Sequence, residues 1–182
     1  MISLWLPIVL SAVFVFVLSS VIHMALPWHK NDFKKLPDED KVRAALKPFD
    51  VPPGDYMMPL CEGGNYNSPD YQAKLADGPN WLLTALPKGS TSMGPTFVQW
   101  FAYLLAVGFF TAYIALHAVP AGAHYLAVFR VVGAVAFLAH AAALWPQSIW
   151  FRRQWSTTVK CTIDGLAYAL VTAGTFAWLW PR

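Results

Sequence analysis

Charged residues are scarce in this chain. Among its 182 residues there are 13 Lys and Arg and 10 Asp and Glu, whereas 57% of the residues are hydrophobic. This balance is too apolar for a soluble domain. The net charge of +3 is spread over the connections between apolar stretches, without the clustered basic surface that nucleic acid requires. The composition therefore indicates a membrane protein whose main partner is the lipid bilayer and which does not bind nucleic acid.

Cysteine is rare, and the familiar catalytic motifs are missing. Cys61 and Cys161 form no CxxC pair, which argues against a disulfide framework and a cysteine zinc site, so we interpret both as free thiols. The sequence contains neither His-Glu-x-x-His nor Gly-x-Ser-x-Gly, and the segment from Gly89 to Gly94 lacks the Gly-Lys-Ser/Thr ending of a phosphate loop. We therefore predict no catalytic residues, and the sequence favours a protein that is not an enzyme.

Long apolar runs dominate what is present. A bilayer core about 30 Å thick needs roughly 20 apolar residues per helix, and four runs, at 2–26, 96–119, 124–145 and 163–180, are long enough. The first has no basic n-region, so we expect it to be retained and not cleaved as a signal peptide. Tryptophan favours the headgroup region, and eight of the nine tryptophans fall near a proposed end: Trp5, Trp28, Trp100, Trp145, Trp150, Trp155, Trp178 and Trp180. The sequence thus predicts an all-α membrane protein of four transmembrane helices.

Positive charge predicts the orientation, because loops rich in Lys and Arg stay in the cytoplasm. Eight Lys and Arg residues lie between Trp28 and Pro95. Three more, Arg152, Arg153 and Lys160, follow the third run, whereas the opposite side has only Arg130 and Arg182. We therefore expect a multi-pass protein with both termini in the periplasm.

The polar segment 28–95 is predicted to form a small α+β cytoplasmic loop. A helix start is indicated where Pro37 is followed by three acidic residues, and Pro48 ends that helix. A second helix is indicated between the cap Ser68 and the stop at Gly78. Two extended runs, Asp55 to Leu60 and Trp81 to Leu86, are expected to pair as a ribbon.

Histidines are the first candidates for a cofactor site. The predicted topology places His23 and His140 at similar depth near the inner face, where facing imidazoles can hold haem or a metal. His117 and His124 flank the short outer turn as a second pair. The alternative is that these histidines lie at headgroup level or bond to a neighbouring helix without any ligand. His29 with Met57, Met58 and Cys61 offers donors that copper or zinc accepts, but their spacing matches no metal motif.

Two ionisable residues lie in or near the membrane runs. Charge there is costly, so Arg130 and Asp164 are candidates for a transport function. Their predicted depths differ, which argues against a pair. Lys160, one helical turn before Asp164, is expected to be its local partner.

Small residues recur at every fourth position of the last run. Gly165, Ala169, Ala173 and Ala177 form a groove that lets another helix approach closely. The groove is suited either to packing within one bundle or to packing between copies of the chain. The sequence leaves both alternatives open.

Two stretches carry a resemblance to a known group of proteins. One is Ser20 to Asp40, with its His-Met-x-x-Pro-Trp-His-Lys segment. The other comprises Trp155 to Lys160, Ile163 to Gly165 and Thr172 to Pro181. These stretches resemble small four-helix proteobacterial inner-membrane proteins of unassigned function. The resemblance implies a bacterial inner (cytoplasmic) membrane and no catalytic activity.

Together these patterns favour a non-enzymatic inner-membrane protein that acts as an oligomeric accessory or scaffold subunit of a membrane complex. A redox subunit that binds haem b, copper or another metal through His23 and His140 is the first alternative. A small transporter or channel that uses Arg130 and Asp164 is the second.

Overall fold

The computed structural model describes residues 4–89 and 92–181, which form two compact units. The helical unit comprises residues 4–34 and 92–181, and the loop unit comprises residues 35–89. Each unit has its own secondary structure, and the candidate site lies in the helical unit.

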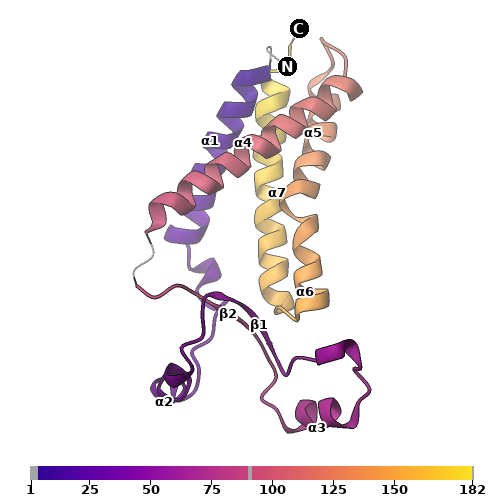
Figure 1. The fold of residues 1–182 in the computed structure, drawn as a ribbon. Helices are drawn as coiled ribbons and strands as arrows, with labels where there is room; N and C mark the ends of the chain where they lie inside the picture. Colours follow the sequence, from indigo (N-terminus) through magenta and orange to yellow (C-terminus); the bar gives the residue numbers. More distant parts are fainter. Residues whose placement is uncertain (1–3, 90–91, 182) are drawn as a thin grey trace. The chain divides into compact units, whose positions relative to one another are not determined.

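The helical unit is built from long helices joined by short turns (Figure 1). Helix α1 (Trp5–Ser20) continues into a π-helical turn (Val21–Ala25) and a 3-10 turn (Pro27–His29). Helix α4 (Met93–Ala118) leads through a short turn to α5 (Tyr125–His140). A 3-10 turn (Ala142–Leu144) and the short helix α6 (Trp145–Phe151) prolong α5, and α7 (Trp155–Trp178) completes the unit.

Three helical segments are long and apolar enough to cross a membrane. They are Trp5–Ala25, Met93–Ala118 and Tyr125–Phe151, which confirms the membrane class and places three of the predicted runs on helices. The fourth predicted span, 163–180, falls on α7, which is not among these segments, so the prediction of four apolar spans is only partly confirmed. Asp164 and several threonines lower the mean hydropathy of α7, and this explains the difference.

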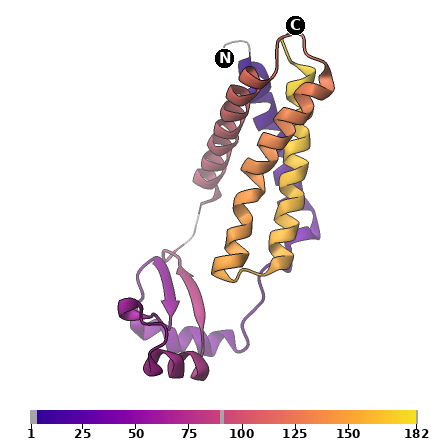
Figure 2. The same cartoon turned by 90° about the vertical axis from the view of Figure 1, so that its right-hand side faces the viewer.

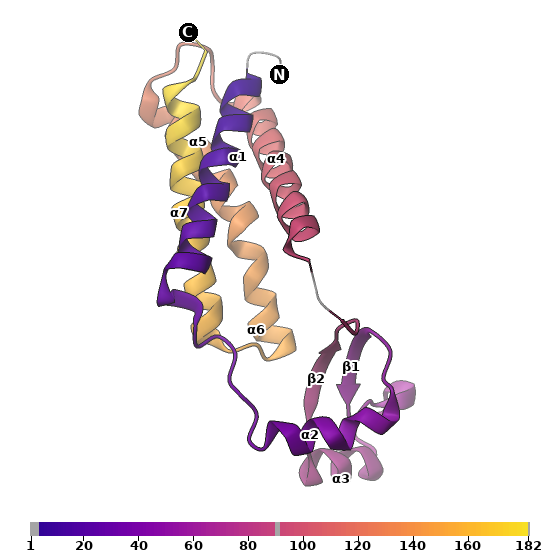
Figure 3. The ribbon, with the colours of Figure 1, turned by 90° about the vertical axis from the view of Figure 1, so that its left-hand side faces the viewer.

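Helix α7 lies at the centre of the packing, because it contacts both α5 and α1. Helix α1 also packs against α4 (Figures 2 and 3), which contacts α5 and is inclined to it in Figure 1. One buried cluster, which includes Leu4, Val128, Phe176 and Trp180, fills the end of the unit where the first and last described residues meet. A second, around Val15, Leu104 and Tyr168, fills the opposite half. The candidate site lies beyond this second cluster.

The small residues of α7 are used within the chain. Ala169 and Ala173 are buried, and a Cβ added at Gly165 would lie 3.0 Å from the Ala141 Cβ and 3.1 Å from the His140 carbonyl oxygen. Helix α5 and the turn after it therefore occupy the groove that the fourfold spacing predicts. Of the two alternatives for this groove, the structure shows packing inside one bundle.

The loop unit contains the short elements that the sequence predicts. It comprises α2 (Glu39–Leu46), a 3-10 turn (Lys47–Phe49), β1 (Gly54–Met58), a second 3-10 turn (Glu62–Gly64), α3 (Pro69–Asp77) and β2 (Trp81–Ala85). The strands pair antiparallel, with Gly54 opposite Ala85 and Met58 opposite Trp81. Ser68 caps α3 by accepting a hydrogen bond from the Tyr71 backbone N–H at 3.4 Å. The predicted helices and the ribbon are therefore confirmed, with both strands ending earlier than expected.

Candidate functional site

His23 is positioned by an irregular end to the first helix. The Leu26 backbone N–H donates to the Val21 carbonyl at 3.1 Å, which closes a π-helical turn, a feature that often marks functional sites in helices. Pro27 then ends the helix, because the residue before a proline is driven out of the α conformation, and Leu26 is extended. His23 is thereby placed close to Tyr168 of α7, whose hydroxyl donates to the His23 Nε2 at 3.4 Å.

His29 connects the segment after α1 to α7. It lies in the 3-10 turn that Pro27 begins, and its two ring nitrogens face two carboxylates. The Nδ1 atom is 2.6 Å from the Asp32 Oδ2, and the Nε2 atom is 2.8 Å from the Asp164 Oδ2. The imidazole ring of His29 also packs against that of His23, with the ring centroids 4.4 Å apart.

Lys160 bonds to Asp32, one of the two carboxylates that His29 contacts. Its ammonium donates to the Asp32 Oδ1 at 2.8 Å and lies 5.9 Å from the centre of the Trp28 ring. Burial raises the pKa of Asp32, but hydrogen bonds from Lys160 and His29 outweigh that effect, so its pKa lies below the ordinary value. Asp32 is therefore a carboxylate at neutral pH.

The cluster is buried and brings two carboxyl groups to one imidazole. Only 14% of the His29 side chain, 9% of that of Asp32 and 7% of that of Asp164 is exposed. A neutral imidazole has a single N–H, so it can donate to one of the two carboxylates and must turn a lone pair to the other. Buried like charges are costly. Either one further proton, shared between His29 and Asp164, or a metal ion would complete these contacts.

The same residues meet the requirements of a metal site. One ligand atom from each of His23, His29 and Asp164 can be chosen so that all three lie within 4.8 Å of one another. With bonds of about 2.1 Å, ligand atoms on one ion are roughly 3.0 to 3.4 Å apart, so small side-chain rotations would suffice. Two imidazoles and one carboxylate suit divalent transition metals such as zinc or iron. The bond from His29 Nδ1 to Asp32 is the outer carboxylate contact that orients metal-bound histidines.

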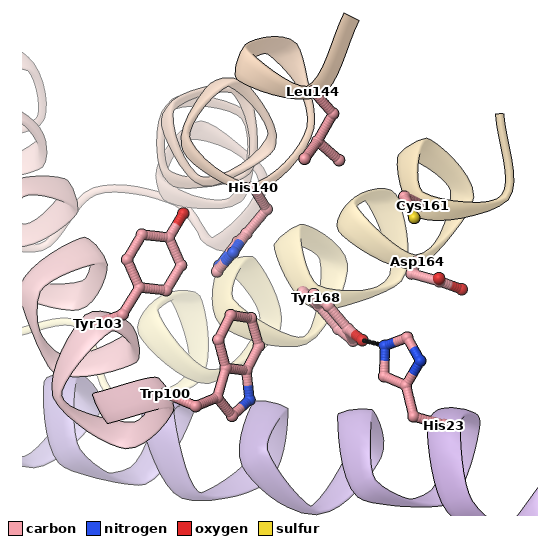
Figure 4. Close-up of a pocket in the computed structure, with 8 residues that line it drawn as sticks. All are labelled: His23, Trp100, Tyr103, His140, Leu144, Cys161, Asp164 and Tyr168. Atoms are coloured by element: carbon pink, nitrogen blue, oxygen red, sulfur yellow. Dashed lines mark hydrogen bonds between the residues drawn. The ribbon is translucent and has the colours of Figure 1, made fainter. Parts of the chain in front are cut away.

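A partly open pocket adjoins this cluster (Figure 4). Its volume is about 330 Å³, and the residues that line it are His23, Trp100, Tyr103, His140, Leu144, Cys161, Asp164 and Tyr168. They come from the π-helical turn after α1, from α4, α5 and α7, and from the turn after α5. His23 and Asp164, two of the three candidate ligands, thus form part of the pocket wall.

His23 and His140 share this pocket but are not arranged as axial ligands of haem. Tyr168 lies between them in Figure 4, with its hydroxyl bonded to His23 and its ring centre 5.6 Å from that of His140. Axial histidines must face each other across the iron. A haem held by this pair is therefore not supported by the geometry, although both histidines line the same pocket.

The partner predicted for Asp164 was wrong. Lys160 lies one turn away on the same helix, yet its ammonium bonds to Asp32, and Asp164 bonds to His29. Both contacts join residues far apart in the sequence, which spacing along one helix cannot predict. Arg130 is exposed on α5 and Asp164 is buried on α7, and the described contacts do not bring them together.

The remaining predicted histidines bond elsewhere. His117 Nδ1 donates to the Tyr113 carbonyl at 2.7 Å, and His124 Nδ1 accepts the Leu126 backbone N–H at 3.2 Å as the cap of α5. The described partners of His29 are Asp32 and Asp164, whereas Met57, Met58 and Cys61 belong to the loop unit. Of these predicted candidates, the described site includes His29.

Asp32, Trp100 and Tyr168 were missed as site residues. A signal was available for Asp32, because it follows His29 by three residues at the inner end of the first span. The predicted topology puts Lys160 and Asp164 at the same depth on the last span. A search for ionisable residues at the same predicted depth on different spans would have grouped these residues, which are His29, Asp32, Lys160 and Asp164. Trp100 and Tyr168 carry no comparable signal, since aromatic residues are common at such depths.

Comparisons of this chain with protein-family models, with curated proteins and with solved structures find no match. The function must therefore be argued from the site itself.

Proposed function

We propose that this chain is a metal-binding membrane protein, in which His23, His29 and Asp164 hold one divalent transition-metal ion at the inner end of the helical unit. The observation that carries the proposal is the convergence of these three donors. Carboxylate Asp32, bonded to His29 at 2.6 Å, supports it as the outer partner that fixes which ring nitrogen faces the ion.

A metal explains the cluster better than a second proton on His29. A proton would satisfy the two bonds of His29 but leave His23 with only its long bond to Tyr168, whereas a metal uses both rings. An ion with three protein ligands also keeps a coordination position for water or a substrate. Because His23 and Asp164 line the pocket, that position would face into it.

Metal binding is tested on the full chain, purified in mild detergent, freed of any affinity tag and stripped with a chelator. We expect Co²⁺ to produce a visible absorption spectrum that saturates at one ion per chain, and Zn²⁺ to abolish that spectrum by competition. A protein that shows no saturable cobalt spectrum and retains no divalent metal after purification would rule out the proposal.

The topology we propose has four membrane helices, with α7 as the fourth. Its threonines at 157, 158, 172 and 175 are buried, so the polar groups that lower its hydropathy face other helices. The side chains exposed along it include Ile163, Leu166 and Leu170, which are suited to lipid. The Lys and Arg distribution favours the inner side for the metal cluster.

This topology predicts that the N-terminus and the C-terminus of the chain both face outward. A reporter enzyme that works only outside the cytoplasm, fused after Arg182, should be active, and the same reporter inserted between α6 and α7 should be inactive. The reverse pattern would refute the orientation, and activity at both positions would refute the fourth span.

A further inference from the structure

His140 is a buried imidazole whose hydrogen-bonding capacity is unused within the described part of the chain. It is 9% exposed, and among the described residues no side-chain or backbone group forms a hydrogen bond with its ring. Figure 4 shows the ring pointing in among Trp100, Tyr103 and Tyr168. Its ring nitrogens are not among the fully buried polar atoms without a partner in the described residues, so they can bond to a molecule in the pocket that His140 lines.

Aromatic rings form the walls around His140. Trp100 and Tyr103 are stacked with their centres 5.4 Å apart and 20° between their planes. The ring of Tyr103 lies 5.9 Å from that of His140, and Tyr168 completes the wall at 5.6 Å. Flat, electron-rich walls favour a planar ring that can stack or meet them edge to face.

A second polar group lies on the far side of Tyr168. The bond from the Tyr168 hydroxyl to His23 is 3.4 Å long, which is weak, so the hydroxyl can turn to donate to a bound molecule. The pocket thus offers two polar groups along its aromatic wall, the His140 ring and the Tyr168 hydroxyl. Its volume of about 330 Å³ falls within the usual range of ligand pockets, about 300 to 1,000 Å³.

Charge narrows the class of ligand. The lining contains the carboxylate Asp164 and neither Lys nor Arg, so it is unsuited to an anion. All three segments that are apolar enough to cross a membrane contribute residues to the pocket wall, which suits a ligand that dissolves in lipid. A neutral, planar ring with an oxygen at each end meets all of these requirements.

We propose that this pocket binds a monocyclic quinone or its hydroquinone, with one oxygen bonded to His140 and the other to the Tyr168 hydroxyl. The proposal goes beyond the metal site and does not depend on it, because neither of these two groups is a candidate ligand of the ion. It assigns His140 a binding role that its position between helices alone does not explain.

The test is binding of a ubiquinone analogue with one isoprene unit to the full chain in nanodiscs, after removal of metal with a chelator. We expect saturable binding at one molecule per chain. His140→Leu should weaken it about tenfold, the effect of losing one buried hydrogen bond, whereas His140→Gln, which keeps a donor, should bind within about threefold of the wild type. His117→Leu, at the outer end of α4, is the matched control and should bind like the wild type.

Tyr168→Phe keeps the ring and removes only the hydroxyl, so it tests the second contact with little risk to folding. It should weaken quinone binding roughly fivefold. Equal uptake by all variants and by empty nanodiscs would mean partition into lipid alone and would overturn the proposal. Because the protein is free of metal, loss of quinone binding and loss of metal binding are separate results.

Discussion

Replacement of Asp164 by Asn should lower the affinity for Co²⁺ by at least about 100-fold, because outer partners of metal ligands alone account for about 10- to 100-fold and Asp164 is proposed as a direct ligand. The substitution keeps the shape of the side chain and removes its charge. Titration of tag-free, metal-stripped protein followed by visible absorption measures the change.

The fold should survive this substitution. The Asn amide can donate to the His29 Nε2 atom, now 2.8 Å from the Asp164 Oδ2, while His29 donates to Asp32 through Nδ1. Both ring nitrogens of His29 then keep a partner. Removal of one partner of a buried pair destabilises a protein when it leaves the other group uncompensated, and that does not happen here. Asp70→Asn is the matched control, because Asp70 is an exposed carboxylate paired with Lys74 in the loop unit. Equal affinities in Asp164→Asn and Asp70→Asn would exclude Asp164 as a ligand.

The sequence predicted those parts of the fold that depend on neighbouring residues. Ser68 and Pro69 begin α3 because a capping side chain and a fixed proline φ act within one turn. The apolar runs became α1, α4 and α5 because hydropathy over about 20 residues is a sum that needs no knowledge of partners. The two extended runs of the loop unit also pair as predicted, although α3 lies between them in the sequence.

The candidate site could be predicted only in part, since it depends on how the helices rotate about their axes. His23 and Asp164 were singled out because histidine and aspartate are unusual near membrane runs. Their relation to His29 was not visible, because residues 29 and 164 meet only after α7 has packed against α1. The π-helical turn that holds His23 likewise leaves no residue pattern beyond the proline that follows it.

Charge explains why Lys160 and Asp164 do not pair although they lie one turn apart. Each instead bonds to the segment after α1, Lys160 through Asp32 and Asp164 through His29. This arrangement distributes two carboxylates, an imidazole and an ammonium over two elements and ties them together. A pair within α7 would have satisfied both charges locally and left the segment after α1 unattached.

Replacement of Asp32 by Asn should lower the affinity for Co²⁺ about 10- to 100-fold, less than Asp164→Asn, while the stoichiometry stays at one ion per chain. The amide is a weaker acceptor for the His29 Nδ1–H than the carboxylate is, so His29 becomes a poorer ligand without being lost. Titration under the same conditions as for Asp164→Asn provides the comparison, and Asp38→Asn is the control, since Asp38 is an exposed carboxylate paired with Lys41.

The order of the two effects distinguishes the roles of the carboxylates. Asp32 faces the Nδ1 atom of His29 and is also bonded to Lys160, so it can act on a metal only through the imidazole. Asp164 faces the Nε2 atom and belongs to the three donors that converge. If Asp32→Asn abolished the cobalt spectrum while Asp164→Asn preserved it, the ion would lie on the other side of His29, with Asp32 as its ligand and Lys160 displaced from its bond.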